Sequence, residues 1–356
     1  MKIIKTSLHR VEMPFIEPYT IAYETISGCT NLFLRAETDS GLIGWGCAAP
    51  DKAVTGETAD MVEQAYNMTL EPMLRKTDPT TYARINDEMK LRFPKLPATR
   101  AMVDMLMYDL VARRADLPLY RLLGGYSVSI PTSITIGIMG VDETLARAIE
   151  LIKQKFFILK IKGGKNVDED IEKVMKIYEK FGDSINIRFD ANQGYTAEQA
   201  IKFVEETRKA DIDILEQPTP KEDRDLLGKV TKKSSIPIMA DESLMNLSDA
   251  FHLASNDLSD MINIKLMKVG GITEALHINS VAKAAGLECM VGCMDESALA
   301  ISAGMHLALS RANIVYADLD GHLGLLNDPA KDAVIIRNGI MYPSDEPGLG
   351  INELVF

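Results

Sequence analysis

Five ionisable residues end or directly follow short apolar runs at near-regular intervals in the second half of the chain. They are Lys162, Asp190, Glu216, Asp241 and Lys265. Each lies 24 to 28 residues after the one before, which is the length of one strand and one helix. If the runs are parallel strands of one barrel, their carboxyl ends share one face. The pattern therefore predicts a single site with three carboxylates between two lysines.

The three carboxylates Asp190, Glu216 and Asp241 favour a bound cation, since without one they would repel one another. All three offer oxygen atoms, and no Cys or His stands at an equivalent position, so a hard divalent ion is favoured over zinc. Mg²⁺ fits best because its octahedral oxygen shell leaves room for water and substrate. We predict one Mg²⁺ per subunit. A lone strand-end carboxylate more often caps a helix, as Asp241 could.

The lysines fit the same chemistry. In the segment ILKIK, Lys160 and Lys162 share one face of a strand, where two unpaired ammonium groups would be costly to bury. We expect Lys160 and the metal to lower the pKa of Lys162 towards roughly 7–8, the range of a general base. Lys265, across the barrel, provides a second base. Bases on opposite faces of one carbon, beside a cation that stabilises an enolate, predict epimerisation or racemisation.

The elements that position these residues alternate regularly from about residue 130. Amphipathic helical segments separate eight apolar runs, and this alternation implies parallel strands with right-handed crossovers. The runs are 131–137, 158–162, 185–190, 212–216, 236–241, 261–265, 287–293 and 314–320. Eight units favour a closed barrel over an open doubly wound sheet, which would usually carry G-x-G-x-x-G after a strand.

The first 125 residues have a different pattern. Alternating segments around NLFLRAETDSGLIGWG predict a hairpin at DSG, and helical patterns follow at 57–75, 80–91 and 98–115. We predict an α/β fold: an α+β capping domain in residues 1–125, joined by the tail 327–356, and a modified (β/α)8 TIM barrel in residues 126–326.

Composition excludes several classes of partner. The formal net charge of −12 argues against nucleic acid or an anionic membrane, which need a positive protein surface, and favours a small molecule. No apolar stretch has the length of a signal peptide or of a membrane span, so we expect a cytoplasmic protein. The four cysteines form no C-x-x-C pair, and we expect free thiols.

Several motifs, in the same order, resemble the enolase superfamily and within it the muconate lactonizing enzyme subgroup. They are LKIK (159–162), RFDANQGY (188–195), LEQP (215–218), ADES (240–243) and NIKLMKVGG (263–271). The resemblance covers essentially the whole chain. It implies that Asp190, Glu216 and Asp241 bind Mg²⁺ and that Lys162 and Lys265 are the acid/base pair. It also implies a homo-oligomer. We interpret Lys268 as a surface or loop charge.

The eighth run ends YADLDG, which places Asp318 and Asp320 on one face. This resembles the dipeptide epimerases, whose Asp-x-Asp binds the substrate's α-ammonium group, and two carboxylates suit a cation with three donors. A solvated turn is the alternative role. Lys160, Thr135 and Asp295 are further candidate substrate-binding residues.

The resemblance also bears on substrate choice. In this family an N-terminal loop of the capping domain closes over the distal side chain, and members acting on Ala-Glu carry an arginine there. Glu24 stands at that place, while Tyr19 and Ile21 offer aromatic and apolar surface. We therefore predict that hydrophobic, aromatic or cationic second residues are favoured over Glu. If Glu24 instead faces solvent, the pocket is simply apolar.

The sequence thus predicts a Mg²⁺-dependent dipeptide epimerase that inverts the α-carbon of the C-terminal residue of L,L-dipeptides by two-base proton transfer through an enediolate. Alternatives within the subgroup are a muconate cycloisomerase, an o-succinylbenzoate synthase or an N-acylamino acid racemase. A catalytically silent metal-binding or ligand-binding barrel is a further alternative. Two opposed lysines argue against it, since a binding protein has no need of them.

Overall fold

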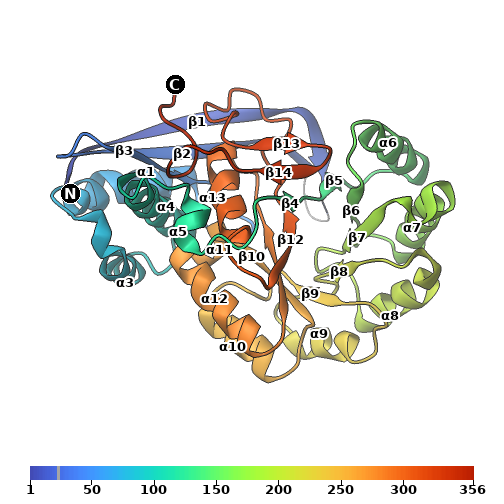
Figure 1. The fold of residues 1–356 in the computed structure, drawn as a ribbon. Helices are drawn as coiled ribbons and strands as arrows, with labels where there is room; N and C mark the ends of the chain where they lie inside the picture. Colours follow the sequence, from blue (N-terminus) through green and yellow to red (C-terminus); the bar gives the residue numbers. More distant parts are fainter. Residues whose placement is uncertain (22–24) are drawn as a thin grey trace.

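A three-stranded antiparallel sheet opens the computed structural model, which describes residues 1–21 and 25–356 (Figure 1). Its strands are β1 (Ile3–Thr20), β2 (Thr25–Thr38) and β3 (Ile43–Ala48), in the order β1-β2-β3. The predicted turn at DSG joins β2 to β3. There the main-chain N–H of Thr38 donates to the carbonyl of Leu42 over 2.9 Å. Gly41 adopts the positive φ of 81° that this turn requires.

Helices cover one face of this sheet. They are α1 (Ala59–Ala65), a five-residue π-helical turn (Tyr66–Leu70), α2 (Glu71–Leu74), α3 (Tyr82–Arg92), α4 (Pro97–Arg114) and α5 (Leu119–Leu123). The helix predicted at 57–75 is thus an unbroken helical run over 59–74 whose middle part is π-helical. Helix α4 is buried on almost every side, and it packs closely on β3 because Gly46 leaves no side chain between them. An added Cβ at Gly46 would collide with the main-chain oxygen of Met102.

Eight parallel strands form the barrel in sequence order from β5 to β12. They are β5 (Ile134–Ile136), β6 (Ile158–Lys162), β7 (Asn186–Asp190), β8 (Ile214–Glu216), β9 (Ile238–Ala240), β10 (Met261–Lys265), β11 (Glu288–Gly292) and β12 (Ile314–Asp318). The edges meet where the main-chain N–H of Ser133 donates to the carbonyl of Ala317 over 3.2 Å. The predicted (β/α)8 architecture with an α+β domain is confirmed.

The barrel helices are α6 (Val141–Lys153), α7 (Val167–Phe181), α8 (Ala197–Glu206), α9 (Arg224–Thr231), α10 (Leu247–Ser255), α11 (Leu266–Val269), α12 (Ile272–Ala284) and α13 (Ala298–Ala308). In α7, Val167, Ile171, Val174 and Ile177 are buried at intervals of three and four, so one stripe faces the strands. Helix α13 is buried on all sides because it lies between β11, β12 and the N-terminal sheet. The ring of helices leaves the carboxyl ends of the strands open towards the N-terminal domain (Figure 1).

The C-terminal segment returns to both units. Strand β13 (Ile335–Arg337) pairs with β14 (Ile340–Tyr342), which in turn pairs with β4 (Ile130–Pro131). At the end of the chain, the ring of Phe356 stacks on His9 of β1 with centroids 4.2 Å apart. The exact domain limits stay a prediction.

Among residues 1–21 and 25–356, no helix combines the length and the apolar character needed to cross a membrane.

Candidate active site

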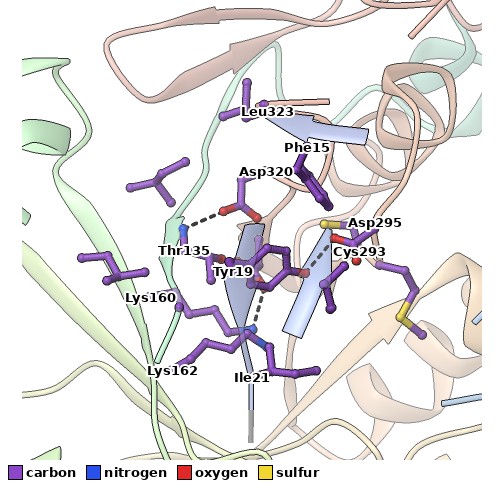
Figure 2. Close-up of a pocket in the computed structure, with 18 of the residues that line it drawn as sticks. Phe15, Tyr19, Ile21, Thr135, Lys160, Lys162, Cys293, Asp295, Asp320 and Leu323 are labelled. Carbon is purple, nitrogen blue, oxygen red and sulfur yellow. Dashed lines mark hydrogen bonds and ion pairs between the residues drawn. The ribbon is translucent and has the colours of Figure 1, made fainter. Parts of the chain in front are cut away.

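A cavity of about 490 Å³ lies at the carboxyl ends of the barrel strands, beneath the N-terminal domain (Figure 2). Its wall includes Lys160, Lys162, Asp241, Lys265, Asp318 and Asp320 from the barrel. Tyr19 near the end of β1, Ile21 just after β1 and Asp295 from the loop after β11 complete this part of the wall. The structure therefore brings side chains from both units into one space, which is closed on one side by β1.

Strand order fixes the sequence of charges around the mouth. Because β6 to β10 are successive neighbours, Lys162, Asp190, Glu216, Asp241 and Lys265 follow one another in that order. Lys162 pairs in register with Asp190, and Asp190 with Glu216. Asp241 directly follows β9. The result is a row of three buried carboxylates with one lysine at each end.

Lys160 is buried among carboxylates. Its Nζ lies 2.7 Å from Asp318 Oδ2, 2.8 Å from Glu216 Oε2 and 3.2 Å from Asp190 Oδ2. Burial lowers the pKa of Lys160, but these three carboxylates more than offset that effect and hold it well above its usual value. Lys160 is therefore a fixed cation at the base of the cavity, and its charge balances part of the acidic cluster.

The two end lysines each contact one carboxylate of the row. Lys162 Nζ lies 3.1 Å from Asp190 Oδ2 and 3.3 Å from Asn192 Oδ1. Lys265 Nζ lies 2.8 Å from Asp241 Oδ2. Burial lowers the pKa of Lys265, but Asp241, together with Glu216 and Glu242, more than offsets that effect and holds the pKa well above its usual value. In this arrangement each lysine is paired with the carboxylate beside it.

The interpretation of Lys268 as a surface or loop charge was wrong. Lys268 is 1% exposed, and its Nζ contacts a carboxylate oxygen of Asp241. The cause is helix α11, a single turn that directly follows Lys265 and folds the chain back against the strand ends. A lysine between the apolar residues of LMKVGG was the sequence signal for this burial.

Within residues 1–21 and 25–356, no three Asp, Glu, His or Cys side chains are arranged to hold a metal ion directly. The carboxylates contact ammonium groups instead. The donor set nevertheless fits a hard divalent cation, because three neighbouring strands supply buried carboxylate oxygens. Beside them, Glu242 Oε2 is buried with no hydrogen-bond partner in the described chain. Burial also raises the pKa of Glu216 to about 8. The cluster thus holds more acidic groups than its ammonium groups satisfy.

The two aspartates of YADLDG have different surroundings. Asp318 contacts Lys160 through Oδ2 and accepts a hydrogen bond from Ser133 Oγ over 2.7 Å through Oδ1. Asp320 Oδ2 accepts from the main-chain N–H of Thr135 over 2.6 Å. Burial and the charge of Asp318 raise the pKa of Asp320 to about 6. Asp318 is thus occupied by an internal cation, whereas Asp320 is the better placed to receive a substrate cation.

The ring of Tyr19 lies in the cavity between Asp295 and Thr135. Its hydroxyl donates to Asp295 Oδ1 over 2.7 Å, and the main-chain oxygen of Asp295 accepts from Asn31 Nδ2 over 3.2 Å. Ile21 is 5% exposed and lines the cavity beside Tyr19. Figure 2 shows Asp295 on one side of the Tyr19 ring and Thr135 with Asp320 on the other. Glu24 lies outside the described residues.

Sequence reasoning missed several polar residues of the site, among them Asn31, Asp51, Ser133, Asn192 and Glu242. Asn192 stands inside RFDANQGY, two residues after Asp190, and an amide next to a strand-end carboxylate was its signal. Asn31 is a polar residue at the start of the buried segment NLFL. Ser133 and Asp51 gave no signal, because their partners are distant in sequence.

Two family models match the chain. Residues 3–124 match the mandelate racemase / muconate lactonizing enzyme N-terminal domain, and residues 143–353 match the enolase C-terminal domain-like family. An L-Lys-D/L-Arg epimerase from Desulforapulum autotrophicum is 40% identical in sequence, and the match covers 99% of this chain and 100% of the epimerase.

Two solved structures are also similar to this chain. A substrate-liganded L-Ala-D/L-Glu epimerase from Bacillus subtilis has a TM-score of 0.95 at 36% identity, covering 100% of both chains. A dipeptide epimerase from Enterococcus faecalis, complexed with Mg and L-Leu-L-Tyr, has a TM-score of 0.94 at 36% identity, covering 99% of this chain and 100% of its own. These epimerases confirm the expectation of an isomerase acting on amino acid derivatives. The chain belongs to the mandelate racemase / muconate lactonizing enzyme family of the enolase superfamily.

Proposed function

We propose that this protein is a Mg²⁺-dependent dipeptide epimerase that inverts the α-carbon of the C-terminal residue. The observation that carries the proposal is the row of three buried carboxylates with Lys162 at one end and Lys265 at the other. Similarity to three dipeptide epimerases, one of them in complex with Mg, supports it.

Asp190, Glu216 and Asp241 would hold the ion, which when bound supplies positive charge next to the substrate carboxylate. Negative charge develops on that carboxylate as the α-proton leaves. One of the two lysines takes the proton from one face of the α-carbon, and the other returns a proton to the opposite face. A neutral amine is needed for the first step. Loss of the contact with Asp241 would remove one of the interactions that hold Lys265 charged.

The Asp318–Asp320 pair, at the next edge of the cavity, would bind the substrate's α-ammonium group. Lys160 neutralises Asp318, and the N–H of Thr135 orients Asp320. An ammonium group fixed at Asp320 places the first residue over β5 and leaves the second residue between the two lysines. This order places the α-carbon of the C-terminal residue at the reacting position.

The second residue's side chain would lie by Tyr19, Ile21, Val54, Asp51 and Asp295. In the described part of the chain, the cations of the cavity wall are Lys160, Lys162, Lys265 and Arg147. None of them lies in that set of five residues. Two carboxylates and three apolar or aromatic groups favour a hydrophobic, aromatic or cationic side chain over Glu. The similar proteins include both an L-Lys-D/L-Arg epimerase and an L-Ala-D/L-Glu epimerase, so side-chain preference must be measured.

The proposal is tested by incubating the protein with a library of L,L-dipeptides in D₂O and reading deuterium at the α-carbon by mass spectrometry. We expect exchange at the C-terminal residue that stops when Mg²⁺ is chelated and returns when Mg²⁺ is restored. Absence of exchange with every dipeptide would contradict the proposal. A cytoplasmic location and a homo-oligomeric assembly stay predictions.

A further inference from the structure

The cavity extends beyond the residues that the proposed chemistry uses. Its wall continues along Ile136, Met139, Leu151 and Phe156, and along β1 from Ile16 to Pro18. We call this extension the β5–α6 arm, because its barrel side is built from the end of β5, the connection to α6, and the α6 face and C-terminal end. Asp295 lies on the other side of the Tyr19 ring from Thr135 (Figure 2).

Main-chain hydrogen bonds join β1 to the barrel on both sides of the arm. The main-chain N–H of Ile138 donates to the carbonyl of Thr20 over 2.7 Å, which ties the β5–α6 connection to the end of β1. The N–H of Ile16 donates to the carbonyl of Gly324 over 2.9 Å, which ties β1 to the loop after β12. The arm is therefore part of the framework of the fold.

The surface of the arm changes from apolar to charged along its length. Ile136 is 1% exposed and Leu151 is 2% exposed, and Met139 and Phe156 are half-buried. At the outer end, Arg147 Nη2 lies 3.7 Å from Glu17 Oε2, and both side chains reach solvent. An apolar group that enters from the cavity would thus be enclosed by apolar atoms before it meets the ion pair.

Asp320 stands at the inner end of the arm. It accepts a hydrogen bond from the N–H of Thr135, the residue that directly precedes Ile136. An ammonium group bound to Asp320 is one bond away from the α-carbon of the first residue of a dipeptide. The side chain of that residue would therefore start at the end of β5, where Ile136 follows Thr135. The ring of Tyr19 lies between Thr135 and Asp295 (Figure 2).

We infer that the β5–α6 arm binds the side chain of the substrate's first residue and selects large apolar first residues, such as Leu, Met and Phe, over Ala. The inference rests on the proposed function, because it needs the ammonium group at Asp320. Each buried methylene is worth a factor of a few in affinity, so Leu in place of Ala should gain about tenfold or more.

The test varies the first residue while the second is held constant. Dissociation constants are measured by calorimetry with Mg²⁺ present, and kcat/KM by deuterium exchange, for Ala-Xaa, Leu-Xaa and Phe-Xaa. The variant Met139→Trp places an indole in the arm. The matched control Ala146→Trp adds the same ring at an exposed position of α6. We expect a Leu/Ala ratio of about 10 or more in the parent protein and the control, and a ratio near 1 in Met139→Trp.

Two results would overturn the inference. One is equal binding of Ala-Xaa and Leu-Xaa by the parent protein. The other is an unchanged Leu/Ala ratio in Met139→Trp, checked as folded by circular dichroism. If Met139→Trp does not fold, Phe156→Ala serves instead, and an unchanged Phe/Ala ratio there would contradict the inference. Calorimetry separates this outcome from failure of the proposed function: dipeptides that bind without any exchange contradict the epimerase proposal, whereas exchange without first-residue preference contradicts the arm alone.

Discussion

Lys162 and Lys265 occupy equivalent places at the two ends of one row of carboxylates, 3.1 Å from Asp190 and 2.8 Å from Asp241 respectively. The relationship follows from strand order, because β6 and β10 enclose β7, β8 and β9. A substrate carboxylate bound at the middle of the row would therefore have one lysine on each side of its α-carbon. This placement suits removal and return of a proton on opposite faces.

The two lysines should be separable by substitution. We expect Lys162→Ala and Lys265→Ala each to lower epimerisation by roughly 10²–10⁴-fold, the usual contribution of a general acid or base. Each variant should retain deuterium exchange from one epimer through the surviving lysine. Exchange is measured on the L,L and L,D forms separately. Lys165→Ala, at an exposed position three residues beyond Lys162, is the control. Full epimerase activity in either test variant would rule out the two-base scheme.

Recognition of the free amino terminus should depend on Asp320. N-acetylation of the substrate removes the ammonium charge, which we expect to cost roughly 1.5–3 kcal/mol per lost charge-assisted hydrogen bond, or about 10–150-fold in kcat/KM. The substitution Asp320→Asn should lower kcat/KM more for the free dipeptide than for the acetylated one. The effects of N-acetylation and of Asp320→Asn should therefore not be additive. Equal turnover of free and acetylated dipeptides by the parent protein would instead favour the N-acylamino acid racemase.

Side-chain preference should exclude Glu at the second position. Its carboxylate would lie near Asp51 and Asp295, in a cavity where burial weakens screening. We expect kcat/KM for Ala-Glu to be at least about tenfold below that for Ala-Leu, Ala-Phe or Ala-Lys. A repulsion of ~1.4 kcal/mol between the substrate carboxylate and the two aspartates is enough to give that factor. Steady-state kinetics on the four dipeptides decides the matter, and Ala-Glu as the best substrate would contradict this reading of the pocket.

The sequence predicted those parts of the molecule that local pattern controls. Strand-end residues such as Asp190 and Lys265 were visible because one βα unit has a nearly constant length and periodicity 2 fixes which face a side chain takes. The partners of these residues were not visible. That Lys160 pairs with Asp318, 158 positions away, depends on closure of the barrel. The burial of Lys268 depends on α11, which is a single turn and is too short to show a helical period in the sequence. Contacts across units, such as Tyr19 with Asp295, depend on how the N-terminal sheet lies over the barrel.

Use of a cationic second residue should depend on pH through Asp295. Burial raises the pKa of Asp295 to about 6; Asp51 and Asp320 add to the rise, and the hydrogen bond from Tyr19 and the charge of Lys162 oppose it. Asp295 is therefore mostly protonated at pH 5 and ionised at pH 7. An ionised carboxylate attracts a lysine side chain and does nothing comparable for leucine. We expect the ratio of kcat/KM for Ala-Lys over Ala-Leu to rise between pH 5 and pH 7 and to be flat above. Taking the ratio cancels the titration of the groups that both substrates need.

Titration of Asp295 should also affect stability, which should fall with rising pH where the Ala-Lys/Ala-Leu ratio rises. The folded protein keeps a proton on Asp295 between about pH 4 and pH 6, where the unfolded chain has released it, so this group's contribution to stability falls as pH rises through that window.

In Asp295→Asn, which keeps an acceptor for the Tyr19 hydroxyl, the Ala-Lys/Ala-Leu ratio should no longer depend on pH, and the free energy of unfolding should lose this part of its pH slope. Urea unfolding at pH 4.5 and pH 6.5 measures the second effect. A ratio that rises equally in the parent protein and in Asp295→Asn would assign the cation preference to another carboxylate, with Asp51 the next to test by Asp51→Asn.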